Sequence, residues 1–500
     1  MEQQANEISR NRIARFLNKS PEDFTKADLI KYIESNDIEM VNFRHMGKDG
    51  TLKTLNFVIH SKEQLDRMLS AGERVDGSSL LAAIDAASSD LYLIPRYKTA
   101  FVNPFAEVPT LDILCSYYTH KGIPLPSAPE QILRKAQKSL KDGTGMTMEA
   151  LGELEYYVFY NNKQLFPATA QAGYQESSPF SKWERLRYEA MQAIAQAGGR
   201  IKYGHSEVGN IREGEKEMEQ HEIEFLPVSL EDAADQLVIA KWMLRMIGYK
   251  YGVNISFAPK IMRGHAGSGL HIHSRLIKDG QSMMITNGSL SDIARKTIAG
   301  YLDLAPSLTA FGNTVPVSYL RLVPHQEAPT NICWGDRNRS VLVRVPLSWL
   351  NVNNMAKDAN TRDDSPDTAI SECQTVEFRC PDGSADIYLL LSGLAVAARH
   401  GLEMENALKL ADKLYVDVNI FAEENKAIQE KLPQLPDSCW ESADNLLKDR
   451  KVYEKDGVFP PSVIDQLVKK LKSYKDKNLS EMLYGKEAEI QALVEEYLHC

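Results

Sequence analysis

The sequence predicts an α+β protein with at least two domains, and three observations support this class. Its 500 residues exceed the ~250–300 at which a single hydrophobic core stops growing. Hydrophobic residues make up 43% and charged residues 25%, which is ordinary for a globular protein. Segments with the two-residue alternation of strands occur between long stretches of helical periodicity, and helical patterns prevail from Asp386 onward.

Charge and cysteine content exclude several classes of protein. A net charge of −10 argues against nucleic acid as the partner, so a site for an anionic substrate would need local cations or metal ions. Six cysteines are scattered without a C-x-x-C motif, which argues against a disulfide framework and fits a reducing compartment. The polar N-terminal segment does not resemble a secretory signal, and the longest apolar run, 387–398, is shorter than the ~20 residues of a membrane span. We therefore expect a cytoplasmic protein that does not bind membranes.

The first part of the chain is expected to combine short helices with a small sheet. Helices are predicted over 3–36, where Ser20-Pro21 is typical of an N-cap followed by a proline at the first helical position. Glycines at 47 and 50 indicate the turn of a hairpin. The other elements expected here are the hairpin strands, a helix and a further strand: 40–44, 54–59, 61–71 and 111–118. Prolines and a glycine at 122–126 indicate a connection to the next part.

The second part is expected to alternate long helices with strands. Its predicted helices are 128–141, 183–197 and 230–251. Its predicted strands are a strand pair within 148–159, followed by 220–225, 270–276, 341–346 and 375–379.

The segment 267–273 contains two histidines one residue apart, directly after a Gly-Ser-Gly turn. In a strand, His271 and His273 share one face while Leu270 and Ile272 occupy the other. The glycines indicate a close approach of backbone or ligand. The alternative is a half-buried strand whose histidines face solvent.

Three further strands repeat this spacing with charged residues. The pairs are Glu153/Glu155, Glu222/Glu224 and Glu377/Arg379. A single pair of this kind is usually a solvated strand face, but several carboxylates gathered on one face repel one another unless cations neutralise them. Carboxylate oxygens with an imidazole are ligands suited to Mg²⁺ or Mn²⁺.

A basic set follows in the sequence at Arg321, Arg337, Arg339 and Arg344. We expect these arginines along strands, where forked guanidinium groups recognise carboxylate or phosphate. The alternative is a surface strand paired with Asp336 and nearby acids. The sequence contains no Walker A motif, no GxGxxG and no GxSxG. These patterns together predict metal-assisted phosphate chemistry without a P-loop.

In these segments the chain resembles the type I glutamine synthetase family, in order and over most of its length. The matching segments and family motifs are 74–79 (DGSS), 152–156 (G-x-E-x-E-F), 205–207 with 220–222 (H-x-E and Q-x-E), 259–273 (PKP and NGSGMHxH), 318–329, 337–340, and 376–382 (E-x-R-x-P-D).

The resemblance implies a role for each matching residue. It implies two divalent cations, Mg²⁺ or Mn²⁺, held by Glu155, Glu207 and Glu222 and by Glu153, His271 and Glu377. It further implies substrate binding by Arg321, Arg379 and Gly267, and ATP binding by His273 and Arg344. Arg339 would stabilise the phosphoryl group in transfer, Glu327 would lie on a flap and help deprotonate the amine, and Tyr174 would lie near the ammonium site.

The resemblance also implies the architecture, the partners and the reaction. The expected domains are an N-terminal helical extension over 1–36, a β-grasp domain over 37–118 and a catalytic domain over 119–500, with an antiparallel β-sheet funnel backed by helices. Stacked rings, usually dodecamers, would place the sites between neighbouring subunits. ATP would phosphorylate the γ-carboxylate of glutamate, and ammonia would displace phosphate to form glutamine.

Three positions depart from the family pattern. Gly47 stands where the family has its ammonium-binding aspartate, with Asp49 as a nearby substitute; Ala266 replaces an asparagine, and Thr375 an arginine. These departures leave three functions open: a glutamine synthetase, a γ-glutamyl ligase that uses an organic amine, and a non-catalytic ring-forming relative. Tyr415 resembles a tyrosine that some members modify, and the alternative is an ordinary surface tyrosine.

Overall fold

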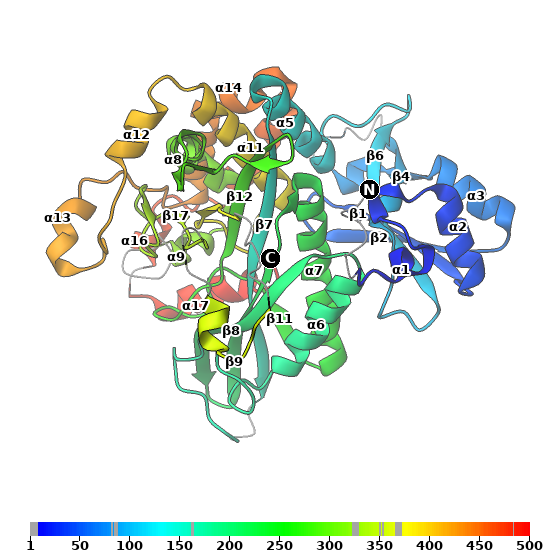
Figure 1. The fold of residues 1–500 in the computed structure, drawn as a ribbon, viewed down its shortest axis with the longest axis horizontal. Coiled ribbons are helices and arrows are strands. Elements are labelled where there is room, and N and C mark those ends of the chain that lie inside the picture. Colours follow the sequence, from blue (N-terminus) through cyan, green and yellow to red (C-terminus); the bar gives the residue numbers. More distant parts are fainter. Residues whose placement is uncertain are drawn as a thin grey trace.

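The structure is a computed structural model. It describes residues 9–500 except 82–83, 85–88, 162–164, 323–329, 350–351, 353–354, 366–372, 484 and the side chain of residue 480. Two sheets and a large helical part make up the fold (Figure 1).

The first sheet lies in the N-terminal part of the chain, with strand order β2-β1-β6-β4-β3 and β5 paired to β6. Strands β1 and β6 are parallel, and the other pairs are antiparallel. The strands are β1 (Met40–Met46), β2 (Leu52–Val58), β3 (Glu73–Asp76), β4 (Asp90–Pro95), β5 (Phe101–Val102) and β6 (Thr110–Thr119). Helices α1 (Arg12–Leu17), α2 (Lys26–Ser35), α3 (Lys62–Ala71) and α4 (Gly77–Leu80) accompany this sheet. Thr25 and Asp28 form a capping box that starts α2.

The second sheet has the order β16-β17-β18-β12-β7-β9-β8. Its main strands are β7 (Thr147–Asn161), β8 (Ile201–Glu213), β9 (Lys216–Phe225), β12 (Leu270–Lys278), β16 (Trp334–Asp336), β17 (Val343–Val345) and β18 (Val376–Phe378). Short strands β10 (Val228–Ser229), β11 (Asn254–Ser256) and β13 (Gln281–Ser282) flank it, and β14 (Ile285–Thr286) pairs with β15 (Ser289–Leu290). Its neighbours are antiparallel except β16 and β17, which are parallel.

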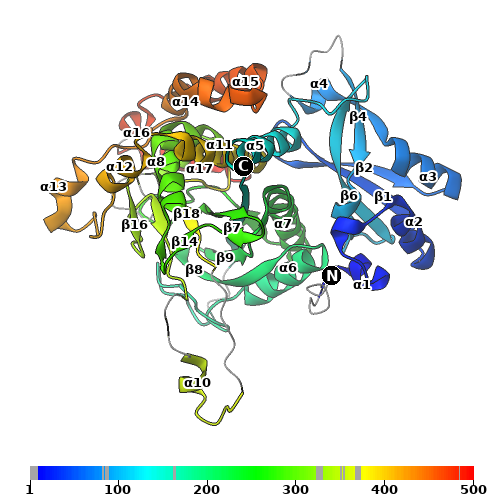
Figure 2. The same ribbon diagram turned by 45° about the horizontal axis from the view of Figure 1, so that its top comes forward.

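Helices pack against this sheet and bury its apolar face. Gly152, in the middle of β7, lets α7 (Leu230–Tyr251) approach closely, because a Cβ there would lie 2.8 Å from Leu237. Figures 1 and 2 show α5, α8 and α11 beside one another, and Figure 2 shows α10 standing outside the body. The remaining α-helices are α5 (Pro129–Thr144), α6 (Glu184–Gln196), α8 (Asp292–Gly312), α9 (Ser318–Arg321), α10 (Met355–Ala359), α11 (Ile387–Glu403), α12 (Ala407–Lys413), α13 (Lys426–Gln429), α14 (Cys439–Glu454), α15 (Pro461–Ser473), α16 (Leu479–Met482) and α17 (Glu487–Glu496).

The first sheet docks on α7 through buried charges. Arg96 donates to both Glu231 and Asp235 at 2.7 Å, and Arg44 lies 4.3 Å over the ring of Trp242. These contacts on α7 hold the two sheets in a defined relation.

None of the helices described is both long and apolar enough to cross a bilayer.

Two predictions about the elements are wrong. The segment 148–159 was expected to hold a strand pair, but it lies within the single strand β7, which spans both sides of Gly152 without a turn. Arg321 was expected on a strand and lies instead in the helical turn α9. Arg337 and Arg339, also expected on a strand, lie between β16 and β17, Arg337 with a φ of 56°. By contrast, the helix predicted over 230–251 is confirmed as α7.

Candidate active site

Three rows of side chains cross the same face of the second sheet. Opposed residues of antiparallel strands share a face, so strand pairing defines each row. The rows are Tyr203–Glu224–Glu153–His271, then His205–Glu222–Glu155, then Leu151–His273–Glu377–Arg344. Since the rows lie two residues apart along the strands, all of them face the same side. The register therefore gathers acids, imidazoles and a guanidinium from six strands.

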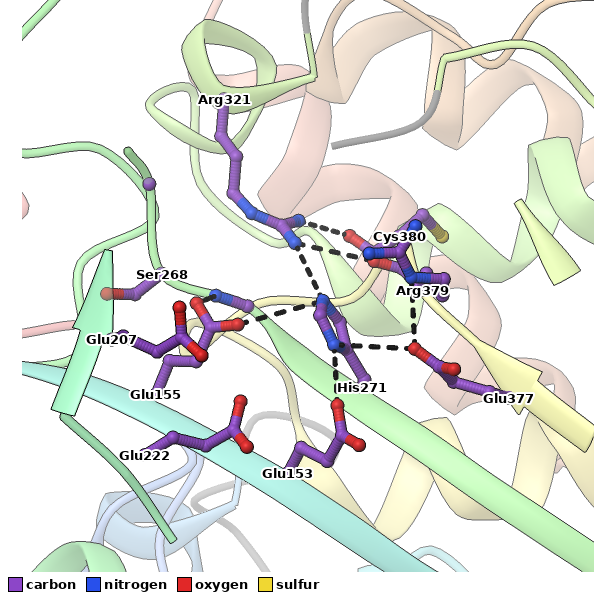
Figure 3. A network of polar contacts seen from close by, with 12 residues as sticks. Glu153, Glu155, Glu207, Glu222, Ser268, His271, Arg321, Glu377, Arg379 and Cys380 are labelled. Atoms are coloured by element: carbon purple, nitrogen blue, oxygen red, sulfur yellow. Dashed lines mark hydrogen bonds and ion pairs between the residues drawn. The ribbon is translucent and has the colours of Figure 1, made fainter. Parts of the chain in front are cut away.

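This face forms the floor of a cavity of about 1800 Å³. The structure brings together there all the predicted site residues that it describes: Glu153, Glu155, Tyr174, Glu207, Glu222, Gly267, His271, His273, Arg321, Arg339, Arg344, Glu377 and Arg379. Glu327 lies outside the described residues. Figure 3 shows His271 in the middle of the cluster, between Glu153, Glu377 and Arg321.

One acidic group lies on β7, β8 and β9. His205 Nε2 is 3.3 Å from Glu222, and His205 Nδ1 is 3.7 Å from Glu207. Glu155 accepts hydrogen bonds from the Gly269 amide at 2.7 Å and from Gln220 Nε2 at 3.1 Å. Ligand atoms of His205, Glu207 and Glu222 all lie within 4.8 Å of one another, so they can share one ion.

Mutual repulsion shapes the protonation of this group. Burial raises the pKa of Glu222 well above its ordinary value, and the neighbouring carboxylates Glu153, Glu155 and Glu207 raise it further. Burial also raises the pKa of Glu155 to about 7, with Glu207 acting in the same direction and His271 against it. When all its carboxylates are ionised, the group therefore has more negative charge than its own protein neighbours neutralise.

A second acidic group lies on β7, β12 and β18. Glu153 is 2.9 Å from His271 Nδ1 and 3.0 Å from His273 Nε2, while Glu377 accepts from Arg344 at 2.8 Å and from Arg379 at 2.9 Å. Burial raises the pKa of Glu153, but the two histidines outweigh it and hold the pKa well below its ordinary value. Burial likewise raises the pKa of Glu377, and Arg379 and the histidines outweigh it. Ligand atoms of Glu153, His273 and Glu377 lie within 4.8 Å of one another.

The arginines reach the cavity from α9, β17 and the segment after β18. Arg321 donates to the Cys380 carbonyl at 2.8 Å and lies 3.5 Å from His271 Nε2. Gly267 leaves room for it, because a Cβ there would lie 3.0 Å from Arg321 Cγ and 2.4 Å from the Pro259 carbonyl oxygen. Arg379 also donates to the Arg339 carbonyl. Guanidinium groups therefore border the acidic cluster on one side.

The segment between β7 and α6 places Tyr174 at the rim of the cavity. Its ring centroid is 5.3 Å from that of His205, and the side chain is 47% exposed. The phenol is therefore accessible from the cavity beside the first acidic group.

The three departing positions have defined surroundings. Thr375 Oγ1 lies 3.0 Å from His273 Nδ1, and the Ala266 carbonyl accepts a hydrogen bond from Tyr157 at 2.8 Å. Gly47 lies in the β1–β2 turn, where Asp49 binds Lys53 at 2.5 Å and accepts from Thr51 at 2.8 Å. The Asp49 carboxylate is thus paired within its own hairpin.

The cavity lining also includes residues that were not predicted as site residues, among them Lys202, Tyr203, His205 and Glu224. His205 was noted only as part of the H-x-E motif, and Glu224 only as the second member of the Glu222/Glu224 pair on one strand. Lys202 Nζ lies 2.7 Å from Glu224. The alternation of Tyr203, His205 and Glu207 along one strand was the available signal for β8, as it was for β7 and β12.

The donor set fits hard divalent cations. Carboxylate oxygens dominate each group and one imidazole joins them, as Mg²⁺ and Mn²⁺ sites require. The described residues supply no cluster of thiolates, since the cysteines at the site and in the core are single. The arrangement can therefore hold cations next to arginines that bind anions.

Comparison with known proteins identifies the family. A model of the family described as "Glutamine synthetase, catalytic domain" matches residues 126–484, and one described as "Glutamine synthetase, beta-Grasp domain" matches residues 37–120. The glutamine synthetase of Clostridium saccharobutylicum is 30% identical, over 86% of this chain and 91% of its own length. That of Thermus thermophilus is 28% identical, over 86% and 91%.

Solved structures share the fold. The glutamine synthetase of Plasmodium falciparum superposes with a TM-score of 0.73 at 19% identity, over 91% of this chain and 97% of its own. A structure of GmaS in complex with ADP gives 0.71 at 17% identity, over 90% and 96%. With both domains matched and relatives similar over most of their length, the chain belongs to the glutamine synthetase family of ligases.

Proposed function

We propose that this protein is an ATP-dependent ligase that forms glutamine from glutamate and ammonia through a γ-glutamyl phosphate. One observation carries the proposal: two acidic groups and a border of arginines face a single cavity built on one register of strands. Such a cavity suits a reaction in which anionic substrates exchange a phosphoryl group.

The acidic groups are the proposed cation sites. Glu155, Glu207 and Glu222 would hold one Mg²⁺ or Mn²⁺, and Glu153, His271 and Glu377 the other. When bound, these ions neutralise the charge of the phosphate oxygens during transfer. The raised pKa values of Glu155 and Glu222 support this assignment, because a nearby cation would relieve the repulsion that raises them.

The arginines are the proposed anion sites. Arg321 and Arg379 would bind the carboxylates of glutamate, and Gly267 would keep the backbone close to the substrate. Arg344 would bind the phosphates of ATP, and Arg339 would stabilise the phosphoryl group as it moves to the γ-carboxylate. The guanidinium of Arg339 has no partner among the described residues and lines the cavity, which supports a role toward a ligand.

Ammonia would then attack the acyl phosphate, forming the C–N bond while phosphate leaves with the electrons of the C–O bond. Tyr174 borders the first acidic group and is the proposed contact for the incoming amine. Removal of a proton from that amine by Glu327 stays a prediction of the resemblance.

We further propose a homo-oligomer of stacked rings, for which light scattering of the purified protein is the test.

An organic amine as nucleophile is the second candidate. Gly47 stands where the family carries its ammonium-binding aspartate, and Asp49 is already bound by Lys53 and Thr51. A β1–β2 turn without a free carboxylate favours a nucleophile that does not need to be captured as a bare ammonium ion. The two candidates differ only in the last step of the reaction.

A phosphate-release assay with an amine panel separates the candidates. The protein would be incubated with glutamate, ATP and Mg²⁺ or Mn²⁺, and with ammonium or one primary amine at a time. Ammonium-dependent turnover with glutamine as the product, identified by mass spectrometry, supports the first candidate. Sustained turnover only with an organic amine supports the second. No turnover with any amine would reject both and favour a non-catalytic family member.

A further inference from the structure

We propose that His273 is a ligand of the cation held by Glu153 and Glu377, and that Thr375 positions it for this role. The inference rests on the cation site of the proposed function, but its test requires neither glutamate nor ATP. It adds a residue to the ligand set and explains the threonine at position 375.

The position of His273 follows from the strand register. On β12 it lies opposite Glu377 of β18, one row away from Glu153 of β7. Its side chain is 5% exposed, and Nε2 lies 3.0 Å from Glu153 Oε1 and 3.9 Å from Glu377 Oε2. An ion that drew these three atoms together would need only small movements of the carboxylates, because their ligand atoms already lie within 4.8 Å of one another.

Thr375 holds the other nitrogen of the ring. Its Oγ1 lies 3.0 Å from His273 Nδ1, and the side chain is 6% exposed directly before β18. A hydroxyl can accept a hydrogen bond from Nδ1–H, so Nδ1 can keep its hydrogen when a cation displaces the hydrogen through which Nε2 contacts Glu153. Nε2 then offers its lone pair to the cation between the two carboxylates. A hydrogen bond of this kind to the second ring nitrogen orients metal-bound histidines and raises their basicity.

The hydroxyl matters because an arginine at this position would have the opposite effect. A guanidinium only donates hydrogen bonds, so Nδ1 would have to accept and the ring hydrogen would lie on Nε2. A histidine in that state donates to an anion and does not bind a cation. Thr375 thus permits the tautomer that cation binding requires.

The competing role for His273 is a contact with ATP phosphates, as the family resemblance implies. The two roles differ in when His273 matters. A cation ligand contributes to metal affinity in the absence of nucleotide. A phosphate contact leaves that affinity unchanged and alters only the dependence of turnover on ATP.

The test is a Mn²⁺ titration of the nucleotide-free protein, with free Mn²⁺ followed by electron paramagnetic resonance. Thr375→Val keeps the shape and removes the hydroxyl, Thr375→Ser restores it, and His273→Gln removes the imidazole. We expect Thr375→Val and His273→Gln each to weaken one class of Mn²⁺ sites by about tenfold or more, within the range seen when a metal-bound histidine loses its supporting contact. Thr375→Ser should bind Mn²⁺ as the wild type does.

Thr297→Val is the matched control, because Thr297 is a buried threonine on α8 whose hydroxyl donates to the Ile293 carbonyl of its own helix. It should leave the titration unchanged. Circular dichroism identifies any variant that fails to fold. If Thr375→Val does not fold, His273→Gln alone tests whether His273 binds the cation. Wild-type affinity in folded His273→Gln, or in folded Thr375→Val, overturns the inference. A raised KM for ATP with unchanged Mn²⁺ affinity would assign His273 to the nucleotide and leave the proposed ligase activity intact.

Discussion

Buried carboxylates have different neighbours in the two sheets of this protein. In the first sheet, Asp112 accepts from Arg44 at 2.7 Å and from Asn42 at 2.8 Å, and Asn103 lies at 3.2 Å. Every one of these partners comes from the same sheet or the loop beside it. In the second sheet, carboxylates lie next to other carboxylates across neighbouring strands.

This difference separates structural charge from functional charge. Burial raises the pKa of Asp112, but Arg44 and two amides oppose the shift, so the carboxylate is satisfied inside the fold. For Glu222, burial and the adjacent carboxylates act in the same direction. A buried acid that is paired with cationic or amide side chains stabilises its domain. A cluster of buried acids with too few such partners is a candidate ligand site, because a bound cation supplies the missing positive charge.

The largest effect, on stability, is expected from removing the buried ion pair between Asp112 and Arg44 in the first sheet. Asp112→Asn keeps the shape of the side chain and leaves the Arg44 guanidinium buried without its counter-charge. The free energy of unfolding of the N-terminal domain should fall by about 3–5 kcal/mol, the usual cost of removing one partner of a buried pair. Urea denaturation measures the loss. Asp90→Asn, at an exposed acid that begins β4, is the control, and equal midpoints for the two variants would contradict the role of Asp112.

Glu222→Gln, in the second sheet, should impair turnover without lowering stability. We expect turnover to fall about 100-fold or more, because a cation ligand is lost, while the cation-free protein becomes no less stable since repulsion is relieved. Steady-state phosphate release and thermal unfolding in EDTA measure the two effects. Glu213→Gln, at the exposed end of β8, is the control. A variant that lost stability but kept its turnover would show that Glu222 is structural.

A smaller effect should appear as a pH dependence at Glu155. The pKa of this carboxyl is raised from 4.5 to about 7 in the folded chain. Its contribution to stability is therefore complete below pH 4.5 and is lost as the pH rises through about 7. In EDTA, the wild type should lose thermal stability relative to Glu155→Gln between pH 5 and pH 8. Parallel curves for the two proteins would contradict the raised pKa.

The smallest effect is expected from Tyr415→Phe. The Tyr415 hydroxyl lies 3.5 Å from Asp336, and the side chain is 41% exposed at the edge of the fold. Loss of so long a hydrogen bond at the surface should change stability by less than about 0.5 kcal/mol and leave turnover unchanged. Thermal unfolding and phosphate release check both values. A large loss of turnover would place this tyrosine in the site.

Much of the second sheet's site could be predicted from the sequence, because alternate side chains of a strand point to the same face. Glu153/Glu155 and His271/His273 were expected on common faces, and the helix 230–251 was expected from its periodicity. The register between strands carries no such local signal. For that reason the sequence did not reveal that Thr375 would meet His273, or that Lys202 would meet Glu224. Arg321 was placed on a strand because four residues are too short to show a helical period.

We infer above all that divalent cations neutralise the carboxylates of the second sheet. The most direct test is thermal unfolding of the wild type at pH 8, in EDTA and then with Mn²⁺ in excess. We expect a higher midpoint with Mn²⁺, since an ion at about 100 times its Kd stabilises the fold by about 2.7 kcal/mol. Glu222→Gln should lose most of this gain, and Asp112→Asn should keep it. A wild-type midpoint that does not respond to Mn²⁺ would contradict the claim.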